Sequence, residues 1–120
     1  MKVESQVVFD HLDAVEAAPE HHRTIFENEH VRVLDTIVGA GDSVPLHRHG
    51  WPGVAYYLTT SDFVRYDAAG NVEVDSRRLD VEIVPGTVSW LPPSHEHSIE
   101  NVGEREFRAI VVELKRGEVD

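Results

Sequence analysis

From residue 22 onward, apolar residues occur in short runs that alternate with polar residues, a pattern typical of β-strands. The segment Val72–Asp75 places its two valines on one face and its two acids on the other, because side chains alternate in direction along a strand. Clusters of Gly, Pro, Asn and Asp separate the runs. The pattern predicts strands over residues 24–27, 31–38, 44–49, 54–60, 63–67, 72–76, 79–84, 88–91, 98–102 and 106–115. About ten short strands without a long helical pattern predict an all-β sandwich or barrel of antiparallel strands.

The N-terminal part of the chain lacks the alternating strand pattern. Its one helical signal lies around residues 13–18, where Asp13 is suited to cap the start of a short helix and Pro19 to end it. A chain of 120 residues suits one compact domain. We therefore expect an N-terminal extension over residues 1–22 and a single β-barrel domain over residues 23–117.

Composition and charge narrow the classes of partner. With 22 acidic and 11 basic residues the formal net charge is −11, which repels phosphate backbones and anionic lipids, so we expect neither a nucleic-acid nor a membrane partner. The chain has no cysteine, which excludes disulfides, thiolate metal sites and cysteine nucleophiles. No signal-peptide pattern and no apolar run of membrane-spanning length is present, so a cytoplasmic location is the expectation.

Eight histidines in 120 residues is a high count, and their spacing carries the candidate chemistry. His47 and His49 are one residue apart, so on a strand both point to the same side. His95 and His97 repeat this spacing about fifty residues later, after Pro92-Pro93. Three imidazoles that converge on one point are a common metal-binding arrangement.

These residues resemble the two motifs of the cupin superfamily. The segment Gly41-Asp-Ser-Val-Pro-Leu-His47-Arg-His49 fits the first half of motif one, Gly-x5-His-x-His. Motif two, Gly-x5-Pro-x-Gly-x2-His-x3-Asn, is matched at the following positions, with serine where glycine is usual: Gly86, Pro92, Ser94, His97 and Asn101. The resemblance covers about residues 22–115 and implies a small single-domain cupin, an RmlC-like jelly roll or double-stranded β-helix.

The resemblance also implies a ligand set. The metal ligands of the family fall on His47, His49 and His97, and the family glutamate would fall at Gly53 or Val54, where it is absent. Three neutral imidazoles leave a divalent ion with its full charge, so we expect an anionic ligand such as a carboxylate or enolate. We also expect Gly53 to leave space beside the metal. The metal can be iron, zinc, nickel or manganese.

Other residues are assigned by their position relative to the motifs. His95, Trp51, Tyr57 and Gly53 are expected around the site or on the cavity, with His95 either at the rim or a further ligand. Arg48, Glu96 and Glu100 are expected to point away from the histidines. Arg65 and Arg108 are both candidates to place a guanidinium in the cavity, and the pattern leaves their facing open. The histidines outside the motifs are expected at the surface: His11, His21, His22 and His30.

Two functional hypotheses follow from this pattern. The first is a metalloenzyme that acts on a small anionic molecule, either a non-haem dioxygenase or a metal-dependent isomerase or lyase. Cupins with three histidines and no acid include dioxygenases that hold iron. The alternative is a non-enzymatic sensor or carrier that binds a small ligand in the barrel, with or without metal. Small cupins commonly dimerise, so a homodimer is also expected.

Overall fold

The computed structural model describes residues 11–115. These begin with a short helix, α2 (Ala14–Ala17), whose N-cap Asp13 accepts a hydrogen bond from the backbone of Val15. The predicted helix and its cap are therefore confirmed. Within residues 11–115 no helix is long and apolar enough to cross a membrane. Residues 1–10 of the predicted extension lie outside the described residues.

The described residues otherwise form mainly short strands, as the alternating pattern predicts. The strands are β1 (His22–Glu27), β2 (Val31–Val38), β3 (Ser43–His47), β4 (Gly53–Thr59), β5 (Phe63–Asp67), β6 (Val72–Asp75), β7 (Val88–Leu91), β8 (His97–Asn101) and β9 (Phe107–Leu114). A 3-10 turn, η1 (Ser76–Arg78), follows β6. Three of these ranges agree residue for residue with the prediction, and most others differ by one or two residues at an end.

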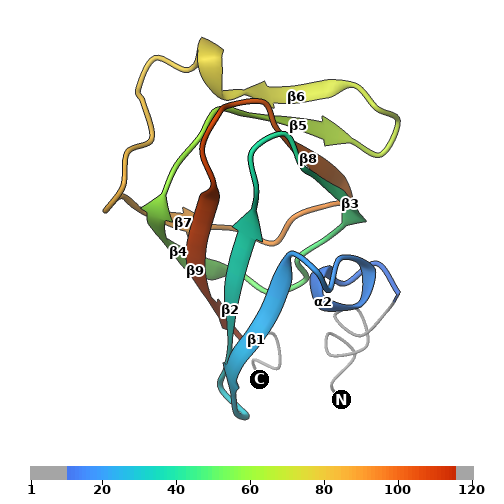
Figure 1. Cartoon of the computed structure of the whole chain (residues 1–120). Coiled ribbons are helices and arrows are strands. Elements are labelled where there is room, and N and C mark those ends of the chain that lie inside the picture. Colours follow the sequence, from blue (N-terminus) through green and yellow to red (C-terminus); the bar gives the residue numbers. More distant parts are fainter. Residues whose placement is uncertain (1–10, 116–120) are drawn as a thin grey trace.

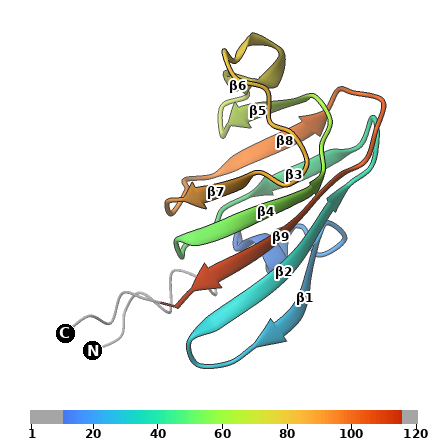
Figure 2. The same cartoon turned by 90° about the vertical axis from the view of Figure 1, so that its left-hand side faces the viewer.

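The strands form two antiparallel sheets that face each other (Figure 1). One sheet has the order β1-β2-β9-β4-β7 and the other β3-β8-β5-β6. Seen from the side, the chain crosses repeatedly between them, and α2 lies beside β1 and β3 at one end (Figure 2). Two facing antiparallel sheets with this order make a jelly roll, so the predicted all-β fold class is confirmed.

The space between the sheets is only partly filled by side chains. In the larger sheet the inward positions of three strands carry a buried cluster of Leu34, Ala55, Ala109 and Val111. Two of these four residues are alanines, which remove little volume from the interior. The inner face of the larger sheet therefore lines a cavity as well as a core.

The segment 79–84 corrects one strand prediction. Its alternating residues suggest a strand, but it connects η1 to β7 without pairing in either sheet. Leu79, Val81 and Val84 are 45%, 76% and 47% exposed. Alternation alone does not make a strand when no neighbour offers free backbone groups to pair with.

The predicted homodimer stays a prediction, since the structure describes a single chain. β1 is an edge strand of the larger sheet, and five of its six residues are exposed.

Candidate metal centre

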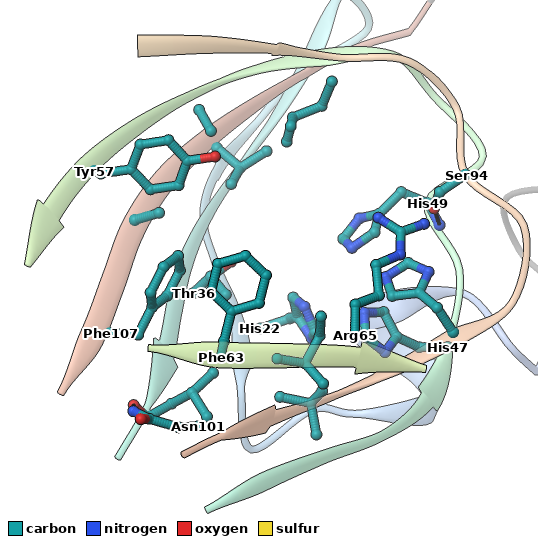
Figure 3. A pocket seen from close by; sticks show the side chains of 18 of the residues that line it. His22, Thr36, His47, His49, Tyr57, Phe63, Arg65, Ser94, Asn101 and Phe107 are labelled. Carbon is teal, nitrogen blue, oxygen red and sulfur yellow. Dashed lines mark hydrogen bonds between the residues drawn. The ribbon is translucent and has the colours of Figure 1, made fainter. Parts of the chain in front are cut away.

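Four histidines from three segments of the chain meet at one end of the cavity (Figure 3). His47 is the last residue of β3 and His97 the first of β8, and these two residues are direct partners in the β3–β8 register. His49 follows two residues after His47. His22, the first residue of β1, completes the group from the opposite sheet.

The imidazole rings are close enough to share one ion. The centroid of the His47 ring lies 4.4 Å from His97, 5.1 Å from His49 and 4.8 Å from His22. One ring nitrogen each of His22, His47 and His49 lies within 4.8 Å of the others. His97 packs on His47 and lies 5.9 Å from His49 between centroids. The tightest donor group thus includes His22, with His97 beside it.

Hydrogen bonds fix which nitrogen of each ring is available. Each Nδ1 faces an oxygen that only accepts: Ala18 O for His22 at 3.1 Å, Pro45 O for His47 at 2.8 Å, Glu113 Oε2 for His49 at 3.0 Å and His95 O for His97 at 2.8 Å. Nδ1 must therefore carry the proton in each ring, which leaves the Nε2 lone pair free. Metal-binding histidines are oriented in this way, so the donor set fits a metal ion.

Burial keeps three of these rings neutral. Desolvation, followed by the neighbouring imidazoles, lowers the pKa of His22 from 6.5 to about 2. Burial is also the main cause that lowers the pKa of His47 to about 4 and that of His97 to about 3. Neutral imidazole is the form that binds metal, so these residues need not release a proton at neutral pH.

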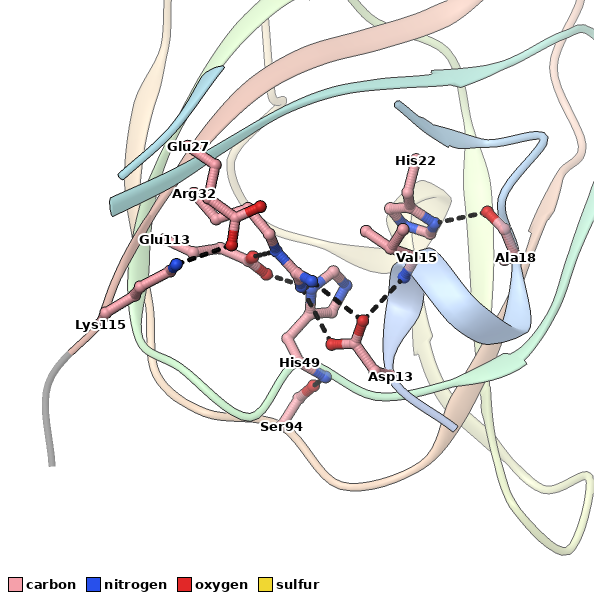
Figure 4. A network of polar contacts seen from close by, with 10 residues as sticks. All are labelled: Asp13, Val15, Ala18, His22, Glu27, Arg32, His49, Ser94, Glu113 and Lys115. Carbon is pink, nitrogen blue, oxygen red and sulfur yellow. Dashed lines mark hydrogen bonds and ion pairs between the residues drawn. The ribbon is translucent and has the colours of Figure 1, made fainter. Parts of the chain in front are cut away.

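A buried ionic network stands behind His49 (Figure 4). Glu113 on β9 accepts from His49 Nδ1 through Oε2 and from Arg32 Nε through Oε1, at 3.0 and 2.6 Å. Arg32 also donates both Nη groups to Asp13, at 2.9 and 3.0 Å. Burial would raise the pKa of Glu113, but the hydrogen bonds from His49 and Arg32 lower it overall. Glu113 is therefore an ionised carboxylate that orients His49 and keeps the ring proton on Nδ1.

The sequence motifs do not include His22 or Glu113. His21 and His22 were expected at the surface, yet they are 8% and 3% exposed. That expectation was wrong because His22 pairs with Thr36 on β2 and faces the cavity. No motif in the sequence predicts this position for His22. Glu113 did leave a signal: it continues the inward series Ala109, Val111, where a charge requires a partner.

Gly53 corrects another expectation. A Cβ at this position would lie 2.7 Å from the backbone oxygen of Val112 and 3.3 Å from Glu113 Cα. The close approach of β9 fills the place of a side chain, so Gly53 does not open space beside the histidines. Gly53 and Glu113 are partners in the β4–β9 register. The carboxylate near the site therefore comes from the neighbouring strand and contacts a histidine.

The remaining sequence candidates divide between the cavity and its surroundings. Tyr57 and His95 line the cavity, whereas Trp51 is 5% exposed and packs against Arg32, with the guanidinium carbon 5.1 Å from its ring centroid. His95 lies at the rim with its side chain 63% exposed, and its Nε2 bonds Glu73 at 2.6 Å. Arg65 lines the cavity, while Arg108 pairs with Asp35 outside it.

The cavity itself has a volume of about 420 Å³ and runs from the histidines to an apolar wall. Tyr57, Phe63 and Phe107 form much of that wall (Figure 3), with Phe107 contacting the other two rings at centroid distances of 5.6 and 5.9 Å. A cavity of this size and composition is suited to a small organic molecule.

Solved structures identify the fold. The chain is similar to a cupin domain from Bordetella pertussis Tohama I, at 23% identity and a TM-score of 0.64 over 79% of this chain and 92% of that one. An RmlC-like cupin with a double-stranded β-helix from Methanocaldococcus jannaschii matches at 13% identity and a TM-score of 0.56, over 78% of this chain and 77% of that one. The polyketide cyclase RemF from Streptomyces resistomycificus matches at 20% identity and a TM-score of 0.52, over 79% of this chain and 64% of that one.

No protein-family model and no curated protein sequence matches the chain. The structural likeness shows the cupin fold, as the resemblance in the sequence implied. Within this fold the chain carries a histidine cluster that could hold a metal.

Proposed function

We propose that the protein is a metal-dependent cupin in which His22, His47, His49 and His97 bind one divalent transition-metal ion. The observation that carries this proposal is the common hydrogen-bond arrangement of the four rings, with each Nδ1 bonded to an acceptor oxygen. An all-imidazole donor set favours iron, zinc or nickel over manganese, which prefers oxygen ligands.

The ligand of this centre is a small anion. Neutral imidazoles cancel none of the charge of a divalent ion, and Glu113, the nearest buried carboxylate, is already engaged by Arg32 and His49. An anionic molecule in the cavity would supply the missing negative charge. The bound metal would polarise an oxygen of that molecule, or, if it is iron, would support oxygen chemistry.

The residues of the chain position this centre. The backbone carbonyls of Ala18, Pro45 and His95 hold three rings, and Glu113 holds the fourth. Apolar side chains line the side of the cavity opposite the histidines. Fixed ligands beside an apolar pocket are an arrangement suited to metal-assisted catalysis.

Elemental analysis of protein purified without oxygen, after expression with iron, zinc and nickel supplied, tests the proposal. We expect about one ion per chain in the wild type and strong loss in His47→Ala and His97→Ala. The control is His30→Ala, because His30 is exposed and pairs with Glu29 at the surface. Less than about 0.2 ion per chain in the wild type would contradict the proposal and favour the alternative, a small-ligand binding protein without metal.

A further inference from the structure

We propose that Arg65 forms an anion subsite beside the histidine cluster, and that the cavity binds a carboxylic acid with an apolar body and a nearby hydroxyl or oxo group. This inference rests on the proposed function in one respect: the acid and the metal share the cavity. The subsite itself is built from residues that belong to no part of the metal centre.

The first observation is the position of Arg65. It lies on β5, opposite Ile99 of β8, and its side chain lines the cavity with 27% exposure. Figure 3 shows the side chain rising from β5 with its guanidinium beside the imidazoles of His47 and His49. A fixed positive charge therefore lies beside the histidine cluster, where it would attract an anionic ligand of the cavity.

The second observation is how Arg65 is held. Its Nε donates to Glu73 Oε1 at 3.0 Å, and Glu73 Oε2 accepts from His95 Nε2 at 2.6 Å. Glu73 thus anchors the rear of the guanidinium from β6. Within residues 11–115, the two Nη groups of Arg65 make no hydrogen bond to the protein. They leave a fork of donors suited to bind the two oxygens of one carboxylate.

The third observation is an unsatisfied hydroxyl. Thr36 lines the cavity next to His22, its partner in the β1–β2 register. Its Oγ1 is buried and has no hydrogen-bond partner among the described residues. A buried hydroxyl without a partner costs about 1–3 kcal/mol. A turn of the Thr36 side chain about χ1 would bring Oγ1 to the cavity, where a ligand oxygen would supply the partner. Thr36 lies beside Phe107 and Phe63, on the side of the cavity away from Arg65 (Figure 3), so this oxygen belongs between the apolar body and the acid group of the ligand.

The aromatic wall defines the remainder of the ligand. Tyr57, Phe63 and Phe107 present ring surfaces to a cavity of about 420 Å³, a volume that holds an aromatic or branched side chain. The chemical class is therefore a hydroxy or oxo acid with an apolar substituent. 3-Phenyllactate represents this class, 3-phenylpropionate lacks the hydroxyl, and 3-phenyllactamide lacks the negative charge.

Calorimetric titration of these three compounds tests the subsite in both zinc-loaded and metal-free protein. We expect 3-phenyllactate to bind the wild type best, and Arg65→Met to weaken its binding at least about 10-fold. The amide should bind the wild type and Arg65→Met alike. Arg65→Lys, which keeps the charge without the fork, should recover only part of the affinity. Thr36→Val should remove most of the preference for 3-phenyllactate over 3-phenylpropionate.

Arg77→Met is the matched control, since Arg77 is exposed on η1 and pairs with Asp75. Melting curves and metal content confirm that each variant is folded and loaded as the wild type is. Equal binding of acid and amide, absence of binding at millimolar concentration, or equal binding by Arg65→Met would overturn the subsite and leave the metal centre standing. Arg65-dependent binding in a protein that takes up no metal would support the subsite and overturn the proposed function.

Discussion

The two His-x-His pairs have the same spacing, but the structure uses them differently. His47 and His97 are equivalent: they face each other in the β3–β8 register, and each Nδ1 bonds the carbonyl of the residue two positions earlier at 2.8 Å. The residues between the histidines are also matched, because Arg48 and Glu96 form an ion pair of 2.9 Å and neither lines the cavity.

The second members of the pairs separate. His49 joins the cluster, where buried Glu113 accepts its Nδ1 proton. His95 turns to the rim, where its Nε2 meets Glu73. His49 and His95 both lie just outside the strands that carry their partners, so the spacing leaves their direction open. Each ring turns toward a different carboxylate, Glu113 or Glu73.

The largest expected effect comes from removing those carboxylates in turn. Glu113→Ala leaves Arg32 paired with Asp13 but removes the buried acceptor of Arg32 Nε and of His49 Nδ1. We expect this loss to lower the free energy of unfolding by about 2–5 kcal/mol. Metal affinity should fall about 10–100-fold, because His49 loses its orienting partner. Urea denaturation and metal competition with a chelator measure the two effects.

Glu73→Ala is the matched change for the second pair. Its ion pairs are partly exposed, so the loss of stability should stay within about 1 kcal/mol, with metal content unchanged. Glu113→Gln, which keeps the shape and can still accept a hydrogen bond, should fall between the wild type and Glu113→Ala. Similar stability losses in the two alanine variants would contradict the distinction between the pairs.

A second way to test the comparison is to restore the missing family glutamate. Gly53→Glu should destabilise the protein by about 2 kcal/mol or more, since its Cβ would clash with the backbone of β9. Metal affinity should not rise, because the side chain cannot enter the site without displacing that strand.

Gly53→Ala isolates the Cβ contact and should cost about 1–3 kcal/mol. Gly39→Ala is the control, because nothing lies within 4 Å of a Cβ at that position, and its change should stay within about 0.5 kcal/mol. A Gly53→Glu variant with wild-type stability and tighter metal binding would show that the glycine is an open ligand position after all.

The sequence predicted the parts of the site that depend on local spacing. Alternation and turn residues gave most strands and the fold class, and the two motifs placed His47, His49 and His97 near each other. The segment 79–84 was mispredicted because strand formation depends on an available neighbour, which is a property of the whole sheet.

The rest of the site depends on contacts across strands. Glu113 and Arg32 are direct partners in the β2–β9 register, 81 residues apart in the chain. Each is a charged residue at an inward strand position, so each alone suggests a buried charge. Their pairing, and the approach of His22 from β1, follow only from the sheet order.

Acid titration measures how His22, which packs against His47 and His49, changes the pH dependence of the free energy of unfolding. The folded protein keeps the rings of His22, His47 and His97 neutral, with pKa values lowered to about 2, 4 and 3, whereas the unfolded chain takes up protons near pH 6.5. Their contribution is therefore fully present above pH 6.5 and is lost as the pH falls toward those values.

His22→Leu removes one of the three groups. In metal-free protein the free energy of unfolding should fall between pH 6 and 4 less steeply in this variant than in the wild type. The difference between the two slopes should be about 1.4 kcal/mol per pH unit. Ala18 O keeps the backbone hydrogen bond from His21, so little else changes. Parallel stability curves for the variant and the wild type would mean that His22 is not held neutral inside the fold.

The smallest expected effect concerns His95. Its side chain is 63% exposed and bonds Glu73 on a partly exposed surface, so His95→Ala should change the free energy of unfolding by no more than about 1 kcal/mol. Metal content should match the wild type, whereas His97→Ala should lose the ion. If His95→Ala loses the ion as well, both members of the second pair are ligands. The spacing that the two pairs share, rather than the carboxylate that each ring contacts, would then determine which histidines bind the metal ion.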